Sequence, residues 1–463
     1  MDHTTNQPQY PTGQPRVVSY RLACVTSTSS SQGGNAMLKE CPAEATDASI
    51  SVMVRWLPLV VILTYLNMTV LLLVVGPWNY PIDNPFSVYT FLLISHLALF
   101  VGYKSVAHKE PRGYTGSITP SQLIGLAVLV NSIVALPTSV ALTGSFLPDV
   151  MGGLENPGDL YTRTQQLRLE TSVIGYVRIL LAYPIFYILP LGVYYFFQIS
   201  RTLQVLTLTT ICFNVCLYIG MGTNKYIADC VIFSFWMLAA SHKTHKFRRK
   251  WYVDMGIVAL IVGGAFGFFK FFSAASNTRI QTKGVFMPGH VQADYGHWLI
   301  RNMDPDTQQG CIALISYLTQ GYYGLSLCME KPFFPMCGVG HSMFLTRNAA
   351  KLTGYSSLVE LSYAARLSTE NDPEWSDSWT TIYPWIASDV SFLLTPVVVF
   401  VIGRGFALCW LDSVGGKNPF APIALANVVN MLVFFPAHNW ALAGGENIVS
   451  FWLSLFFWLH YRG

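Results

Sequence analysis

Five charged residues lie within or at the ends of long apolar stretches of this sequence. They are Arg178, Lys225, Asp229, Lys270 and Asp389. An ionisable side chain in such a place is costly unless it faces a cavity or a partner. Lys225 and Asp229 are four residues apart, so they share one helical face and favour an ion pair. Together the five predict a polar pocket with positive charge suited to an anionic head group. Singly, Arg178 and Lys270 also fit cations that reach toward the membrane surface.

A long polar segment, 273–382, supplies further groups of the same kind. Arginine binds phosphate or diphosphate through a planar fork of donors, which lysine does not reproduce. A positioned histidine is the usual general base near neutral pH. The basic and imidazole residues of this segment include Arg279, Lys283, Arg301, Arg347, Arg366, His290, His297 and His341. Taken one at a time, each is more often a solvated surface residue.

The acidic and sulfur-containing residues point away from metal chemistry. The acidic run at 370–377 has no neighbouring cluster of His or Cys, so it is better explained as a solvated turn than as a metal site. The chain has nine cysteines, but their spacing is irregular and predicts no disulfide framework. We therefore expect neither a metal nor a cofactor.

The composition predicts that the elements holding these residues are membrane helices. Hydrophobic residues make up 52% of the chain and charged residues only 11%, whereas a soluble domain carries about 25% charged residues. The predicted fold is all-α: a polytopic integral membrane protein with about ten transmembrane helices, each near the roughly 20 residues that cross a bilayer. The predicted spans are 56–76, 86–103, 120–142, 173–197, 202–221, 225–241, 252–272, 383–411, 420–437 and 447–461.

Basic residues mark one face of the predicted bundle. The loops at 104–112 and 242–250 are the most basic, and Arg462 is on the same side. Because positive residues concentrate in cytoplasmic loops, this face and both termini are predicted to be cytoplasmic. The large polar loop 273–382, between the seventh and eighth spans, then lies outside, over the span ends that carry the five charged residues.

The chain divides into four parts by composition. Residues 1–50 are polar and are predicted to be a disordered cytoplasmic segment, with Met37 as a candidate alternative start. Residues 51–272 hold the first seven spans, 273–382 form the outer loop, and 383–463 hold the last three. No internal repeat is visible, which argues against an inverted-repeat transporter. The net charge of +4 does not indicate nucleic-acid binding, because the basic residues sit in short loops.

Several motifs in the second half of the chain are similar to those of a known family. They are 316–327 (SYLTQGYYGLSL), 338–344 (GVGHSMF), 379–392 (WTTIYPWIASDVSF), 436–439 (PAHN) and 220–225 (GMGTNK). They resemble motifs of the bacterial oligosaccharide repeat-unit polymerases, the Wzy-type O-antigen and capsule polymerases. The resemblance covers about residues 210–450. The chain departs from the family pattern at Lys225, where many members have arginine, and at His438, where asparagine is expected.

The resemblance implies an activity and a set of partners. Such enzymes take undecaprenyl-diphosphate-linked oligosaccharides at the periplasmic face of the bacterial inner membrane. They transfer the growing chain to a sugar of the next repeat and release the carrier diphosphate. The expected partners are this lipid-linked oligosaccharide and the bilayer, with a chain-length regulator protein as a further candidate. Loop 273–382 would then be periplasmic.

The resemblance also implies residue roles. The candidates for binding the diphosphate are Arg178, Lys225, Arg279 and Arg301. His341 is the leading candidate for the catalytic base, and Asp389 is an alternative base or the carboxylate that orients it. Cations in these positions would neutralise the departing diphosphate without a metal.

Three other activities compete with this interpretation. An O-antigen ligase would share the fold and the donor and differ only in the acceptor. A flippase or exporter of lipid-linked oligosaccharide would need a cavity reaching the cytoplasmic face, where Arg404 is the chief buried charge. A metal-dependent glycosyltransferase would be expected to carry an acidic pair in its first outer loop, which here has only Asp83.

Overall fold

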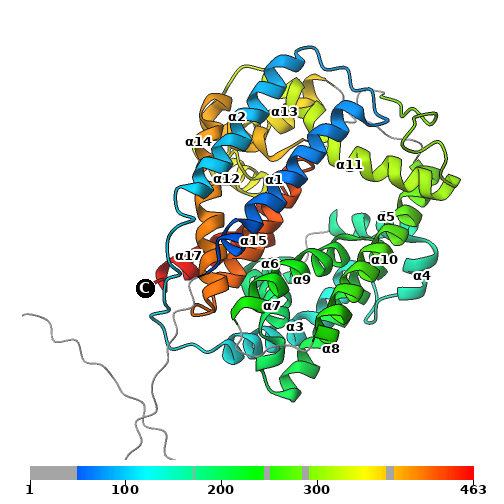
Figure 1. Ribbon diagram of the computed structural model, residues 1–463. Helices are drawn as coiled ribbons and strands as arrows, with labels where there is room; N and C mark the ends of the chain where they lie inside the picture. The colour runs from blue at the N-terminus through cyan, green and yellow to red at the C-terminus, as the bar shows by residue number, and fades with distance from the viewer. Residues whose placement is uncertain (1–49, 170–172, 245–250, 284–290, 372–379) are drawn as a thin grey trace, which may run out of the picture. The chain divides into compact units, whose positions relative to one another are not determined.

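We analysed a computed structural model of the chain, which describes residues 50–169, 173–244, 251–283, 291–371 and 380–463 (Figure 1). Within helices, the side chains of 168–169, 242–244, 251–254, 257 and 278–283 are not described. The predicted N-terminal segment lies outside these ranges up to residue 49. Every named element in the described ranges is a helix, which confirms the all-α prediction.

Six described helices are long and apolar enough to cross a membrane, or seven if one bent pair counts as a span. The six are α1 (Val52–Val75), α2 (Pro85–Lys104), α3 (Pro120–Thr143), α8 (Arg201–Gly220), α10 (Trp251–Lys283) and α14 (Ile382–Gly415). The bent pair is α6 (Val173–Leu180) and α7 (Ala182–Tyr195), the latter extended by a 3-10 turn to Gln198, with 57° between its two halves. These helices confirm a multi-pass membrane protein.

The three other predicted spans are also helical, but shorter or more polar. They are α9 (Lys225–Thr244), α15 (Ala421–Phe434) and α17 (Gly445–His460). Between α15 and α17 the chain makes a turn and one short helix, α16 (Trp440–Ala443). At 1.5 Å per residue, the 14 residues of α15 reach about 21 Å, less than the roughly 30 Å of a hydrocarbon core. The count of ten spans therefore stays a prediction.

Local sequence signals explain where several helices begin. The Thr119 hydroxyl accepts a hydrogen bond from the Gln122 backbone N–H, and the Gln122 side chain accepts one from the Thr119 N–H. This is a capping box, followed by Pro120 at the first helical position. Asn84 and Asp304 likewise cap α2 and the helix after residue 304, each followed by proline.

The predicted outer loop is largely helical where it is described. It contains α11 (Pro305–Met329), α12 (Met343–Thr353), the 3-10 helix η3 (Ser356–Leu361) and α13 (Tyr363–Glu370). The first of these covers the stretch 309–329, whose aromatic and apolar character suggests a helix in the sequence. It is joined to α1 by a 2.8 Å hydrogen bond between the hydroxyls of Thr69 and Tyr322. The loop is therefore packed against the bundle.

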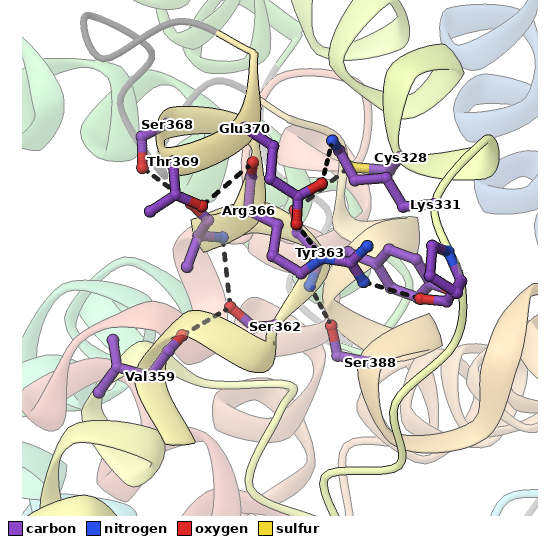
Figure 2. A network of polar contacts seen from close by, with 12 residues as sticks. Cys328, Lys331, Val359, Ser362, Tyr363, Arg366, Ser368, Thr369, Glu370 and Ser388 are labelled. Carbon is purple, nitrogen blue, oxygen red and sulfur yellow. Dashed lines mark hydrogen bonds and ion pairs between the residues drawn. The ribbon is translucent and has the colours of Figure 1, made fainter. Parts of the chain in front are cut away.

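Arg366 organises a polar network under α13 (Figure 2). Its guanidinium is 5% exposed and donates to Glu370 Oε1 at 2.8 Å and to the Pro332 carbonyl at 2.7 Å. Lys331 donates to the other Glu370 oxygen at 2.8 Å. The hydrogen bonds from Arg366 and Lys331 hold the pKa of Glu370 below its usual value. Arg366, a loop cation noted in the sequence, thus has a structural partner on its own helix.

α14 and α2 run side by side (Figure 1), held close by glycines. A Cβ on Gly102 would lie 2.0 Å from the Phe400 carbonyl oxygen, and one on Gly403 would lie 2.3 Å from the Leu99 oxygen. Only glycine permits backbones to approach so closely. α14 also has a break at Ser391, whose φ of 70° and ψ of 161° are not helical. Such a conformation costs a non-glycine residue about 1–3 kcal/mol and is found most often at functional sites.

Candidate functional site

The break in α14 places Asp389 against the turn before α12. One carboxylate oxygen of Asp389 accepts hydrogen bonds from the backbone N–H groups of Gly338 and Gly340, each at 2.8 Å. The other oxygen accepts from the backbone N–H of His341 and from its Nδ1, each at 2.9 Å. The turn forms because Cys337 and Gly338 adopt positive φ values of 52° and 87°. The two candidate catalytic residues, 48 positions apart, are therefore in direct contact.

The contact with Asp389 sets the tautomer of His341. An ionised carboxylate only accepts hydrogen bonds, so Nδ1 carries the proton and Nε2 keeps its lone pair. Nε2 is buried and has no hydrogen-bond partner among the residues that the structure describes. Asn439 donates to the His341 carbonyl at 2.7 Å, and the Trp452 ring stands edge-on to the imidazole at 6.3 Å. The arrangement supplies an oriented base whose reactive nitrogen is covered by protein.

Lys225 and Asp229 form the ion pair that their spacing predicts, in the first turns of α9. Both side chains are mostly buried. The Lys225 ammonium also lies 5.1 Å from the centre of the Phe434 ring and 5.3 Å from that of Trp440. An ammonium held by ring faces and one carboxylate keeps a fixed position.

Arg178 has a partner that the sequence did not suggest. Its Nε and Nη2 donate to the two carboxylate oxygens of Glu446 at 2.8 and 2.7 Å, and its Nη1 donates to the Thr138 hydroxyl at 3.2 Å. Glu446 lies in the first turn of α17, one position before the predicted last span. A charged residue at the start of an apolar helix was the available signal, but nothing links it to a residue 268 positions away. Arg178 therefore does not present a free fork in this structure.

One segment, 436–447, connects these three groups. Asn439 holds the His341 carbonyl, Trp440 lies against Lys225, and Glu446 pairs with Arg178. Gly445 permits the close packing, since a Cβ there would lie 2.7 Å from the Phe344 ring and 2.9 Å from Ile179. The predicted convergence of charged residues from several helices is thus present for Arg178, Lys225 and Asp389. The 436–447 segment and the groups it contacts are the candidate site.

The remaining candidates are not placed at this segment. Arg279 is on α10, but its side chain lies outside the described residues. Arg301 is exposed in the turn before α11, and its side chain makes no hydrogen bond or ion pair with any described residue. Lys270 is exposed on α10, 5.9 Å from the Phe266 ring, and lines a hollow of about 280 Å³ with Asp306. The roles of Arg279 and Arg301 stay predictions.

In the part of the chain that the structure describes, no set of three or more His, Cys, Asp or Glu side chains could hold a metal ion. The groups that could bind an anion are instead the guanidinium of Arg178 and the ammonium of Lys225. That the activity needs no metal stays a prediction.

Comparisons with known proteins add no assignment. No protein-family model, curated protein or solved structure matches this chain. The motif resemblance therefore stays a prediction, and the function is argued from the chemistry of the site.

Proposed function

We propose that this chain is a membrane glycosyltransferase that polymerises oligosaccharide repeats carried on a lipid diphosphate. The observation that carries the proposal is the His341–Asp389 pair, which is contacted by the same 436–447 segment that contacts two cations from other helices. A base beside anion-binding groups suits the transfer of a sugar from a diphosphate leaving group to a hydroxyl.

The proposed reaction needs one proton transfer. His341 Nε2 takes the proton from an acceptor sugar hydroxyl, while Asp389 holds the Nδ1–H and stabilises the imidazolium that forms. The hydroxyl oxygen bonds to the anomeric carbon of the donor, and the bond from that carbon to the diphosphate oxygen breaks. The electron pair leaves with the lipid diphosphate, and the imidazolium later returns its proton to solvent. Asp389 is thus a positioning carboxylate, and His341 is the catalytic base.

The cations would stabilise the charge that develops on the leaving group. The fork of Arg178, paired with Glu446 in this structure, matches two phosphate oxygens, and Lys225 supplies a compact point charge held by aromatic rings and Asp229. Arg279 and Arg301 remain further candidates. Since protein cations supply the countercharge, elongation by the purified enzyme in excess chelator should proceed at nearly the untreated rate.

The proposal includes a location. The substrate would be met at the periplasmic face of a bacterial inner membrane, with ten spans and both termini in the cytoplasm. The short α15 and the 436–447 segment would make one broken span, because irregular backbone is tolerated at membrane depth where protein surrounds it. A cysteine introduced at Ser356 should react with an impermeant thiol reagent on cells with a permeabilised outer membrane. One at Thr244 should react only after the inner membrane is lysed, and equal labelling would overturn this orientation.

Deletion of the gene in its host tests the activity. Surface polysaccharide run on a gel should collapse from a ladder to a single repeat, and the unaltered gene should restore the ladder. Complete loss of surface polysaccharide would instead indicate a ligase, which attaches the chains, or a flippase, which delivers the repeats. An unchanged ladder would exclude all three.

A further inference from the structure

One helix contacts both reactive groups of the candidate site. α17 supplies Glu446, which occupies the fork of Arg178, and Trp452, whose ring lies 6.3 Å from the imidazole of His341. The two contacts involve different turns of the helix and different partners. In the form described here, neither the cation nor the base is open to a substrate.

The Arg178–Glu446 pair is asymmetric in exposure. The Arg178 side chain is 12% exposed, whereas that of Glu446 is 37% exposed. Arg178 is further fixed by the Thr138 hydroxyl, whereas among the described residues only Arg178 forms a hydrogen bond or ion pair with the Glu446 side chain. Glu446 is therefore the more exposed member of the pair, and another anion can replace it while the arginine stays buried.

A carboxylate and a phosphate present similar oxygen pairs to a guanidinium. Both accept two parallel N–H···O bonds in the same plane. Removing Glu446 without a replacement would leave a mostly buried cation unpaired, which is strongly unfavourable. Exchange of one anion for another avoids that cost.

The chain around Glu446 is built to permit such an exchange. Gly444 and Gly445 precede it, at the join of α16 and α17. On the other side, α6 is a single helix of eight residues, bent by 57° from α7. A short helix and a glycine join are elements that can shift by a small amount without breaking long packed helices.

We propose that Glu446 is a resident anion that holds Arg178 in the empty enzyme and is displaced by the diphosphate of the substrate. This inference rests on the proposed function and adds a residue that tunes specificity. A ligand must compete with Glu446 for the fork, so a lipid diphosphate, with more charge and more oxygens, should be favoured over a lipid monophosphate. The same competition would assist release of the diphosphate product after transfer.

Binding measurements on the purified full chain test the inference. Undecaprenyl diphosphate and undecaprenyl phosphate are titrated in detergent with excess chelator, and binding is followed by tryptophan fluorescence. Glu446→Gln keeps the shape and removes the competing charge, so we expect it to bind the diphosphate about tenfold more tightly than the unaltered chain. Glu446→Asp keeps the charge on a side chain one methylene shorter and should show a smaller gain in the same direction.

Glu370→Gln is the matched control. It breaks a comparable arginine–glutamate pair, with Arg366, in a network separate from the 436–447 segment (Figure 2). Its affinity for the diphosphate should equal that of the unaltered chain. If Glu446→Gln fails to fold, the Glu446→Asp result carries the test.

The outcomes separate this inference from the proposed function. If the unaltered chain binds the diphosphate and both Glu446 variants bind it equally or more weakly, Glu446 is only a structural partner of Arg178 and the inference is wrong. If no protein binds either lipid, the proposed function fails and the inference with it. A gain that is equal for diphosphate and monophosphate would overturn the specificity role.

Discussion

Asp389 and Asp412 lie near opposite ends of α14 and have opposite surroundings. Asp412 is fully buried, and its carboxylate accepts from Arg462 Nε at 2.6 Å, Trp458 Nε1 at 2.9 Å and the Arg112 backbone N–H at 2.9 Å. These donors lie on α17, just after α17, and in the turn between α2 and α3. Asp389 is as well supplied with donors, but one of them is a histidine whose second ring nitrogen has no hydrogen-bond partner in the described part of the chain.

The two carboxylates differ in whether the hydrogen-bond network around them is closed. A closed network satisfies every polar atom and has no remaining capacity for chemistry. A network that ends in an unpartnered imidazole nitrogen leaves one lone pair for a substrate. The arginines follow the same division: Arg462 is paired with a carboxylate that is 0% exposed, and Arg178 with one that is 37% exposed.

The largest expected effect concerns the imidazole. His341→Gln should lower the rate of polymerisation by about 10²–10⁴-fold, because the base is lost while the side chain keeps its size. The assay is elongation of lipid-diphosphate repeats by purified protein. The amount of folded protein should hardly change. A polymer ladder of normal length would show that His341 has no catalytic role.

A substitution beside the opposite end of α14 should lower the stability of the fold. Arg462→Ala leaves the Asp412 charge buried without its cationic partner, which should destabilise the fold by about 3–5 kcal/mol. The unfolding midpoint in detergent measures the loss. Arg462→Ala combined with Asp412→Asn should recover part of it, since the buried charge is then removed. Unchanged unfolding of the single variant would contradict the structural role of this pair.

Substitution of Arg178 should lower the activity of the protein more than its stability. Arg178→Ala should abolish elongation while protein remains in the membrane, because Glu446 is partly solvated and tolerates the loss of its partner. Arg178→Lys should restore activity only in part, since an ammonium cannot bind two oxygens in the planar fork geometry. Both are followed by polymer length on gels and by immunoblotting of membranes. Wild-type chain length in the alanine variant would remove Arg178 from the site.

The smallest expected effect is at the network under α13. Arg366 and Lys331 hold the pKa of Glu370 below its usual value, so this interaction stabilises the fold above the ordinary carboxyl pKa. The contribution is lost as the pH falls through the lowered value. Because Glu370 is 45% exposed, Glu370→Gln should cost at most about 1 kcal/mol near pH 7. Unfolding curves of the two proteins should converge in acid; a gap that widens in acid would refute the assignment.

The sequence predicts the local features of this site and misses the long-range ones. The Lys225–Asp229 pair follows from a spacing of four residues on one helix, and the helix at 305–329 from its apolar and aromatic character. These signals are contained in a few turns of chain. The overall class also follows, since composition alone excludes a soluble domain.

The contacts that define the site come from chain segments far apart in the sequence. Residue type and motif indicate His341 and Asp389 as candidates, but no local pattern places them 2.9 Å apart. Glu446 falls one residue before the predicted last span, 447–461, and no local pattern indicates its partner. The break at Ser391 has no proline or glycine at that position to announce it. Packing among several helices determines all three features, and no single stretch of the sequence predicts that packing.

The close packing of α2 on α14 has a consequence for biosynthesis. Gly102 and Gly403, which permit the contact, are separated by about 300 residues. At translation rates of about 5–20 residues per second, roughly 15–60 s pass between synthesis of the two. During that interval the glycine face of α2 has only lipid or insertion machinery to cover it. A ribosome that stalls before residue 403 therefore leaves an unpaired helix in the bilayer, the form of the chain that quality-control proteases are best placed to remove.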